Sequence, residues 1–505
     1  MPIHEIIETK NIPIKVFTNE LEDAARKQLI ELAESGIAVH FISAMPDVHY
    51  GLGATVGSVF ASEDKICPNA VGVDIGCGMA AVPVPELKAK DLSLEFKEKI
   101  HSLIKSNIPT GTNSHSKPKT KSILDNTNRT KWLENKINDK VLSQIGTLGG
   151  GNHFIELVSD ENDDVWIFLH SGSRGIGKQT AEYYNQLAAN YMKSKNIILP
   201  NKDLNYLEIE SEEGQDYLKD MLWCQDFAFE NRQMMLRIIN EILMKEISKE
   251  ADFSKSVNIH HNYCACEDCT IETNSGKIIQ KKLWITRKGA TSARKGQMGL
   301  IPGSMGTGSF LVRGKGNPES WFSSSHGAGR RKSRTKAKAE ISQADFEKSM
   351  LGIVCETVEE LRDEAPAAYK DIHSVMEWQN DIVEILHKFM PLINVKGFDR
   401  DHKPWAKNKI KASLANEKDF GLKVKTVLNY PANKKSNKQS FIEVEYENWK
   451  LNENSHRKNN STEVWVLSED KLQRILLDCK VIDNTKEEIL LQILNIKKRE
   501  KHNQS

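Results

Sequence analysis

Apolar side chains recur at helical spacing in several segments of the chain. Residues 21–35 (LEDAARKQLIELAES) return to an apolar position about every 3.6 residues and end at Ser-Gly, which predicts a helix. A longer stretch at about 215–247 predicts a second helix, and residues 342–364 and 374–390 predict two more.

Short β-rich segments separated by glycine turns fill much of the remaining first four hundred residues. Residues 70–84 (AVGVDIGCGMAAVPV) predict a buried strand, a glycine turn and another strand, and DVWIFLH at 164–170 predicts a further strand. Residues 283–330 alternate short apolar runs with glycine turns. Residues 105–130 have an excess of Lys, Ser, Thr and Asn, which predicts a mobile surface insertion.

The composition changes after Gly397. Residues 398–505 contain 22 Lys and Arg and 16 Asp and Glu, a net charge of +6 in a chain whose total is +1. FIEVEYENWKLN and STEVWVL predict two strands, whereas KLQRILLDCK and KEEILLQILNIKK predict short amphipathic helices. We therefore expect one domain over 1–397 and a small, basic α/β extension over 398–505, with a solvated tail as the alternative.

The overall composition bears on location and partners. No apolar run approaches the roughly 20 residues that span a bilayer, and the N-terminus does not resemble a secretory signal, so we expect a cytoplasmic protein without membrane contact. The eight cysteines do not form a disulfide-type array, which favours a reducing compartment. With a net charge of +1, a nucleic-acid partner would need a local basic face.

Side chains that bind transition metals lie in four glycine-rich turns. They are Asp74, Cys77, His153, His170, His260 and His261. A thiolate can bridge two ions, and two neighbouring ions stabilise the attacking and leaving oxygens of phosphate chemistry. A single histidine at a strand end is more often a hydrogen-bonded core residue, so the prediction rests on the whole set. The ligand types alone favour zinc over manganese.

A separate group of cysteines follows the histidine pair. Cys264, Cys266 and Cys269 have the spacing C-x-C-x-x-C, which could supply three ligands of a structural zinc site. A fourth ligand is not evident in the sequence. Ordinary thiols near a loop are an equal alternative.

Two further loops have residues suited to phosphate chemistry. IPGSMGTGSF at 301–310 offers closely spaced backbone N–H groups but lacks the Gly-Lys-Ser/Thr of a P-loop. SSSHGAGRRKSRTK at 323–336 places His326 among small residues and before a run of cations. An accessible imidazole can attack phosphorus and form a covalent nucleotidyl intermediate, with the cations holding phosphate. A basic surface loop with an incidental histidine is the alternative.

Together these segments resemble the RtcB family of RNA-splicing ligases. The matching stretches are MPDVHYGLGATVGSV, AVGVDIGCGM, GTLGGGNHFIE, LHSGSRGIG, HHNY, TRKGATSARKGQ, LIPGSMGTGSF, SSSHGAGRRKSRTKAK, PAAYKDI and NVKG. They occur in this order from about residue 1 to 397, and the combination of GxDIGCGM with SHGAGR is specific to the family. The resemblance implies a compact α+β catalytic domain with mixed sheets flanked by helices. The lack of strict βαβ alternation agrees with this fold.

The resemblance also implies an activity. Members join RNA ends with a 3′-phosphate or 2′,3′-cyclic phosphate to 5′-hydroxyl ends, using GTP and manganese, in RNA repair or tRNA splicing. A histidine takes guanylate from GTP, passes it to the RNA 3′-phosphate, and the 5′-hydroxyl then displaces GMP. The nucleophile falls on His326. One Mn²⁺ falls on Asp74, Cys77 and His153, the other on Cys77, His170 and His261, in place of the zinc expected from ligand types.

The guanylate contacts implied by the resemblance are more numerous. They fall on Asn152, His153, Phe154, Ile155, Glu156, His261, Asn262, Pro302, Gly303, Ser304, Met305, Ser309, His326, Gly327, Ala328, Gly329, Tyr369 and Lys396. Guanine needs a carboxylate such as Glu156 to accept its N–H groups. Arg174 and Arg330 are candidate RNA-phosphate contacts, with structural salt bridges as the alternative.

Other functions stay open at this stage. A metal-dependent 2′,3′-cyclic phosphodiesterase would keep the metal ligands without needing the His326 loop. A non-catalytic RNA-binding scaffold would use the basic residues 398–505. These residues continue beyond Lys396, where the family's chain usually ends, so they could bind RNA, bind a partner or cover the pocket. The sequence identifies neither the physiological RNA nor an activating protein partner.

Overall fold

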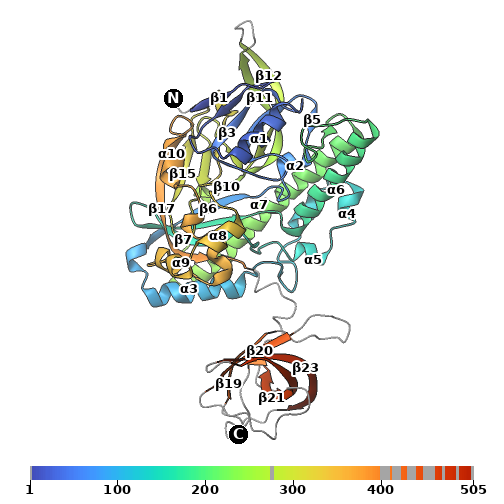
Figure 1. Ribbon diagram of the computed structural model, residues 1–505. Helices are drawn as coiled ribbons and strands as arrows, with labels where there is room; N and C mark the ends of the chain where they lie inside the picture. Colours follow the sequence, from blue (N-terminus) through green and yellow to red (C-terminus); the bar gives the residue numbers. More distant parts are fainter. Residues whose placement is uncertain are drawn as a thin grey trace. The chain divides into compact units, whose positions relative to one another are not determined.

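The computed structural model describes residues 3–271 and 278–398 with their side chains, and residue 272 and six strands beyond residue 398 by their backbone alone. The chain forms two compact units, Met1–Asp399 and Arg400–Ser505. In the first unit, helices surround mixed and antiparallel sheets (Figure 1), so the fold class is α+β, as predicted.

Two large sheets form the centre of the first unit. In spatial order the six-stranded sheet contains β1 (Glu5–Ile7), β2 (Ile14–Val16), β3 (Val39–His49), β4 (Val56–Ser62), β12 (Ile278–Lys288) and β11 (Asn262–Glu272). Its β2 and β3 are parallel, and its other neighbours are antiparallel. The antiparallel seven-stranded sheet contains β10 (Val257–His260), β6 (Gly78–Lys88), β8 (Asp164–Ser171), β7 (Phe154–Ser159), β17 (Val383–Val395), β15 (Ser309–Gly314) and β14 (Met298–Ile301).

Two short ladders and the helices complete this unit. The ladders pair β13 (Ala290–Ser292) with β16 (Ser323–Ser325) and β5 (Lys65–Ile66) with β9 (Leu207–Glu208). The α-helices are α1 (Asp23–Ala33), α2 (Pro68–Val71), α3 (Leu94–Asn107), α4 (Lys131–Glu134), α5 (Asp139–Leu142), α6 (Arg174–Ser194), α7 (Glu212–Ile247), α8 (Arg334–Glu340), α9 (Gln343–Ser349) and α10 (Ile372–Glu377). The 3₁₀ turns are η1 (Ala89–Asp91), η2 (Ser122–Asp125), η3 (Phe253–Lys255), η4 (Pro318–Ser320), η5 (Glu359–Glu364) and η6 (Pro366–Ala368).

The long helix α7 anchors the seven-stranded sheet. Ser211 begins it by accepting a hydrogen bond on its hydroxyl from the Gly214 N–H, at 3.0 Å. Leu236, Ile239 and Leu243 recur at helical spacing and are fully buried in one core with the strands β6, β7 and β8. Burial of such a side chain contributes about 1.5–3 kcal/mol. The helix therefore fixes the sheet whose strand ends build the site.

The structure confirms some predicted elements and corrects others. The helices predicted at 21–35 and 215–247 are α1 and α7. The helix predicted over 342–364 is confirmed over α9 and wrong beyond it, because α9 ends at Ser349 and Gly352 follows at a φ of +89°. The helix predicted over 374–390 is also wrong beyond Glu377, since β17 starts at Val383 and pairs with β7 and β15. Pairing on both sides outweighs local helical spacing there.

The second unit contains one described sheet. Its spatial order is β18 (Ile410–Lys411), β21 (Ser461–Ser468), β22 (Gln473–Asn484), β23 (Glu488–Lys501), β20 (Ser440–Tyr446) and β19 (Leu422–Leu428). The two predicted strands are confirmed as β20 and β21. The two predicted helices are wrong, because those segments are the antiparallel strands β22 and β23. Periodicity alone does not separate a short apolar helix from a strand.

Two surface features of the described residues complete the fold. Most side chains at 105–130 are exposed or half-buried, so the predicted insertion lies at the surface, although its residues 105–107 belong to α3. Its mobility stays a prediction. None of the described helices is long and apolar enough to cross a membrane.

Candidate active site

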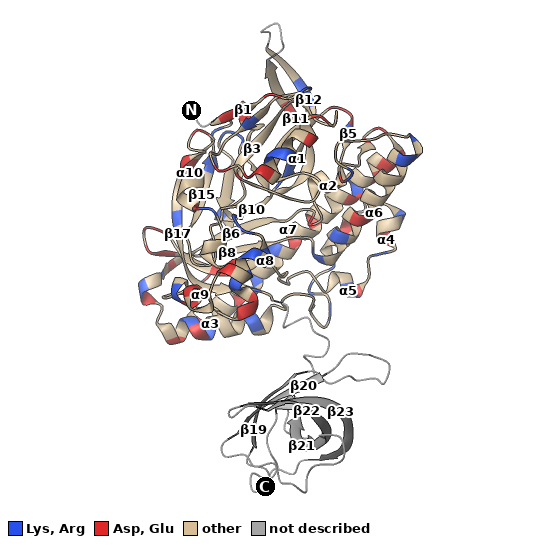
Figure 2. Cartoon of the chain, in the orientation of Figure 1, with Lys and Arg blue, Asp and Glu red and all other residues tan. Residues whose placement is uncertain are grey.

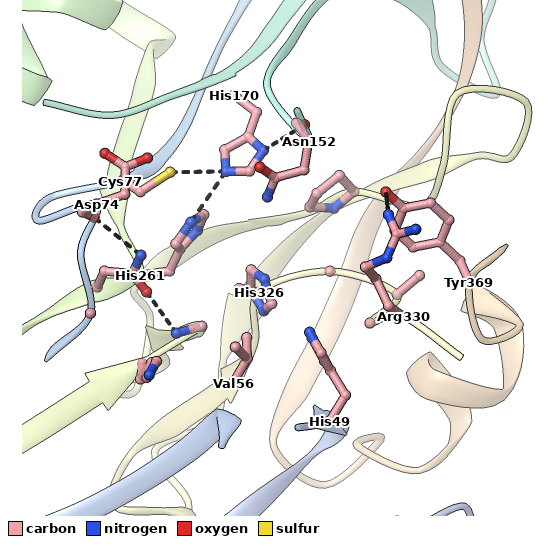
Figure 3. A pocket seen from close by; sticks show the side chains of 18 of the residues that line it. His49, Val56, Asp74, Cys77, Asn152, His170, His261, His326, Arg330 and Tyr369 are labelled. Atoms are coloured by element: carbon pink, nitrogen blue, oxygen red, sulfur yellow. Dashed lines mark hydrogen bonds between the residues drawn. The ribbon is translucent and has the colours of Figure 1, made fainter. Parts of the chain in front are cut away.

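Five metal-type side chains meet where strands of the seven-stranded sheet end. Asp74 and Cys77 lie in the turn between α2 and β6, and His153 directly precedes β7. His170 belongs to β8, and His261 lies between β10 and β11. The pairings of β6 with both β8 and β10 bring these segments together although they are far apart in sequence. Figure 3 shows Asp74, Cys77, His170 and His261 around one space.

The donor atoms of these side chains converge on two overlapping groups. Cys77 Sγ lies 3.3 Å from His153 Nε2 and 3.2 Å from His170 Nε2. His153 Nε2 is 3.0 Å from Asp74 Oδ2, and His170 Nε2 is 3.2 Å from His261 Nε2. One group is Asp74, Cys77 and His153, the other Cys77, His170 and His261, and within each the donor atoms lie within 4.8 Å of one another. Cys77 belongs to both, as a bridging thiolate would.

Hydrogen bonding fixes the free lone pair of His170. Its Nδ1 lies 3.2 Å from the carbonyl oxygen of Asn152, which can only accept, so Nδ1 carries the proton. Burial holds the pKa values of His170 and His261 well below their ordinary range, and both rings are neutral. The Nε2 lone pair of His170 therefore points at Cys77 and His261. Converging lone pairs beside a thiol fit a soft or borderline cation, so these residues fit a metal.

The Asp74 turn requires a glycine opposite it. A Cβ at Gly172 would overlap the Asp74 carboxylate, so any larger residue would displace this carboxylate from His153. Gly172 follows β8 directly, in the LHSGSRGIG motif.

His326 is held beside this cluster by a buried carboxylate. Its Nδ1 lies 2.6 Å from Asp47 Oδ2, and its backbone N–H donates to the same oxygen at 3.1 Å. The Asp47 side chain is fully buried at the end of β3. The His326 ring centroid is 4.8 Å from that of His261. Gly329, at a φ of +73°, allows the loop to approach, since a Cβ there would overlap the Asp47 carbonyl.

A cavity of about 380 Å³ joins the metal-type cluster to His326 and the loops that follow it. Eighteen of the predicted site residues line it: Asp74, Cys77, Asn152, Phe154, His170, His261, Asn262, Pro302, Gly303, Ser304, Met305, His326, Gly327, Ala328, Gly329, Arg330, Tyr369 and Lys396.

Some predicted residues do not line the cavity. Ile155 lies in the core under β7, and the Ser309 hydroxyl accepts a hydrogen bond from the Gly303 N–H at 3.3 Å. Glu156 is buried and accepts a hydrogen bond from Asn394 at 2.6 Å, and burial raises the pKa of its carboxyl to about 8. Arg174 donates to Thr147 and to the Gly111 carbonyl. The roles predicted for these residues stay predictions.

Sequence reasoning missed a carboxylate in this cavity. Glu364 Oε2 accepts hydrogen bonds from Lys396 Nζ at 2.9 Å and from the Tyr369 hydroxyl at 2.7 Å. Its other oxygen accepts from Arg330 Nη1 at 3.3 Å and lies 3.4 Å from Arg334 Nη1. These cations, Lys396 first, lower the pKa of the buried Glu364 to about 2. The signal in sequence was only its place five residues before Tyr369.

The basic run after His326 is largely paired within the protein. Arg331 lies 3.3 Å from Glu20, and Lys332 lies 2.9 Å from Glu340. Lys338 lies 3.4 Å from Asp363, which also pairs with Arg334 at 3.2 Å. Figure 2 shows these cations on and beside α8, next to acidic segments. A polyanion binding here would have to compete with these carboxylates.

The cysteine cluster does not form a third metal group. Cys264 packs in a core with α6 and α7, Cys269 packs in a different core beneath the six-stranded sheet, and Cys266 is exposed. Among the described residues, none of the three belongs to a group that could hold a metal. Alternation along β11 places the buried thiols in separate environments.

Comparisons with known proteins agree with this arrangement. The family model described as tRNA-splicing ligase RtcB matches residues 28–135 and 121–397. The RNA-splicing ligase RtcB of Escherichia coli strain K12 is 40% identical, over 78% of this chain and 100% of its own. The tRNA-splicing ligase RtcB of Methanococcus maripaludis is 30% identical, over 70% of this chain and 87% of its own. On this match across nearly all of the first unit, the chain belongs to the tRNA-splicing ligase RtcB family.

Proposed function

We propose that this chain is a GTP- and Mn²⁺-dependent ligase that joins RNA ends with a 3′-phosphate or 2′,3′-cyclic phosphate to 5′-hydroxyl ends. Membership of the family supports an RNA ligase. The observation that carries the finer proposal is the placement of His326, which is oriented by Asp47. It shares one cavity with four of the five metal-type residues, Asp74, Cys77, His170 and His261.

His326 is the nucleophile in this proposal. Asp47 accepts a hydrogen bond from the Nδ1–H of His326, so the free lone pair of the ring is on Nε2. That lone pair attacks the α-phosphorus of GTP, an N–P bond forms, and pyrophosphate leaves with the electrons of the broken P–O bond. The RNA 3′-phosphate then takes the guanylate, and the neutral imidazole leaves. Asp47 stabilises the positive charge that the ring bears while it is guanylylated.

The two metal-type groups would hold Mn²⁺, one at Asp74, Cys77 and His153 and the other at Cys77, His170 and His261. Bound ions would neutralise phosphate charge and orient the triphosphate and the RNA phosphate. The chain's own contribution is a set of rigid ligands. His170 is oriented by the Asn152 carbonyl, and the Asn262 side chain donates to the Asp74 carbonyl at 3.1 Å.

The guanylate would lie in the part of the cavity between the loop after β14 and Lys396. The cavity lining includes Gly303 and Ser304 of that loop and the aromatic residues Phe154 and Tyr369. The Tyr369 hydroxyl donates a hydrogen bond to Glu364 and accepts one from Arg330 at 3.2 Å. Only the Tyr369 ring is therefore free to contact the base. Lys396 has two further N–H groups beyond the one given to Glu364.

An assay with defined RNA ends tests this function. One RNA ends in a 2′,3′-cyclic phosphate and a second begins with a 5′-hydroxyl. We expect a joined product that requires both GTP and Mn²⁺ and that disappears with His326→Ala. The exposed His373, which does not line the cavity, provides a control, and His373→Ala should join normally. Opening of the cyclic phosphate with no joining by the wild type would instead indicate a phosphodiesterase.

A further inference from the structure

The proposed reaction leaves one histidine of the cavity without a role. His49 is the last residue of β3, two positions after Asp47, and lines the same cavity as His326. Figure 3 shows its ring directed from β3 into the cavity below His326. His49 belongs to neither metal-type group.

The protonation of the His49 ring follows from its one hydrogen bond. Nδ1 lies 2.9 Å from the carbonyl oxygen of Asp47, and a carbonyl can only accept, so Nδ1 carries a proton. Burial, assisted by neighbouring His326, lowers the pKa of His49 to about 4, so the ring stays neutral. Its Nε2 is then a pure acceptor. Within the described part of the chain, no group donates to that nitrogen.

A pure acceptor in a substrate cavity calls for a donor on the substrate. Triphosphate and RNA 3′-phosphate offer only acceptor oxygens and negative charge. In the proposed function the guanine base lies near Lys396 and Tyr369. Hydroxyl groups remain, and one of them must come to the phosphorus beside His326 and lose a proton there. That group is the 5′-hydroxyl of the incoming RNA.

We propose that His49 Nε2 accepts the hydrogen bond of the RNA 5′-hydroxyl and takes its proton during joining, an assignment that rests on the proposed function. As the hydroxyl oxygen attacks, a bond forms between it and the phosphorus of the guanylylated 3′-phosphate. The bridging P–O bond breaks and GMP leaves with its electron pair. The hydroxyl proton passes to His49 Nε2 and from there to solvent. A 5′-phosphate end, which offers no donor, gains nothing from this nitrogen.

Three variants isolate the Nε2 atom. His49→Asn keeps an N–H that can donate to the Asp47 carbonyl but has no atom at the Nε2 position. His49→Gln reaches that position with an amide oxygen that can accept. His40→Asn is the matched control, because His40 lies on the same strand, does not line the cavity and has a φ of +65° that asparagine tolerates.

The test is a single-turnover time course with Mn²⁺, labelled GTP and the two RNAs, resolved into guanylylated enzyme, guanylylated RNA and joined RNA. For His49→Asn we expect normal enzyme guanylylation, accumulation of guanylylated RNA, and joining slowed by roughly 100-fold, the lower end for a positioned acid–base group. His49→Gln should recover part of the rate, and His40→Asn should match the wild type.

Two other results would overturn the assignment. Joining by His49→Asn at the wild-type rate removes the role, and slowed enzyme guanylylation with normal joining places the acceptor on a GTP ribose hydroxyl instead. A third result is distinguishable from both. If the wild-type protein takes no label from GTP, the proposed function is refuted, and the His49 assignment is refuted with it.

Discussion

The carboxylate of Asp47 accepts hydrogen bonds from both the ring Nδ1 and the backbone N–H of His326, through the same oxygen, at 2.6 and 3.1 Å. This fixes the ring rotamer and its tautomer together. In Asp47→Asn the amide oxygen can keep both hydrogen bonds, but the side chain carries no negative charge to stabilise the positive ring of guanylylated His326. We expect enzyme guanylylation, measured with labelled GTP, to slow by roughly 10²- to 10⁴-fold.

The matched control for this variant is Asp371→Asn. Asp371 also accepts two backbone N–H groups, from His373 and Ser374, but at the start of α10 and outside the cavity. That variant should guanylylate at the wild-type rate and keep its stability, because asparagine caps a helix about as well as aspartate does. Equal rates for wild type and Asp47→Asn would show that the negative charge of Asp47 does not contribute to guanylylation.

Cys77 is shared by both metal-type groups, so replacing it should reduce the number of bound metal ions more than replacing one histidine does. We expect Mn²⁺ titrations to find about two ions in the wild type, about one in His153→Ala and about one in His261→Ala, as two separate three-ligand sites require. Cys77→Ala should bind neither ion tightly. Cys355→Ala, which removes a half-buried thiol outside both groups, should bind as the wild type does. A Cys77→Ala variant with two tight ions would exclude the bridge.

The ionisation of Glu364 contributes to the stability of the folded protein. Its pKa falls from 4.5 to about 2, so the folded state favours the ionised form. The stabilisation is complete above the unfolded pKa and is lost as pH falls toward 2. The gap in unfolding free energy between wild type and Glu364→Gln should therefore narrow by about 1.4 kcal/mol per pH unit below about pH 4.5.

Urea unfolding at a series of pH values measures this gap. Asp363→Asn is the control, because Asp363 pairs with Arg334 and Lys338 but not with Lys396 or Tyr369. At neutral pH, Glu364→Gln should also raise the KM for GTP more than Asp363→Asn does, since Lys396 loses its buried partner. A gap that stays constant with pH would show that folding does not lower the pKa of Glu364.

Residues 398–505 offer a prediction about RNA affinity. Their net charge is +6, and the compact first unit ends at Asp399. If the extension contacts RNA, a chain ending at Asp399 should keep enzyme guanylylation but bind RNA more weakly, with a shallower dependence of log affinity on log salt. Filter binding at several salt concentrations measures both quantities. An unchanged affinity and slope would leave the extension without an RNA contact.

Much of the site was predictable because its chemistry is local in sequence. Asp74, Cys77, His153, His170 and His261 each lie in or beside a short motif, and the structure gathers all five. The α7 helix was predictable for a similar reason, since its apolar spacing continues over many turns. Strong local patterns therefore identified both the longest helix and the metal-type residues.

Features set by distant contacts were not predictable. The start of β17 at Val383 depends on pairing with β7 and β15, whose residues are distant in sequence. Glu364 has no motif that separates it from the neighbouring acids, and only packing against Lys396 and Tyr369 reveals its position. Cys264 and Cys269 looked like ligands of one ion by spacing, but they pack into separate cores.

The most direct measurement of the central claim is the site of covalent guanylylation. The protein is incubated with Mn²⁺ and GTP carrying a labelled α-phosphate, denatured, digested under mildly alkaline conditions and mapped by mass spectrometry. We expect one guanylate on the peptide that contains His326, bonded to its imidazole, and no label on His326→Ala. Label retained by His326→Ala, or mapped to another residue, would contradict the account.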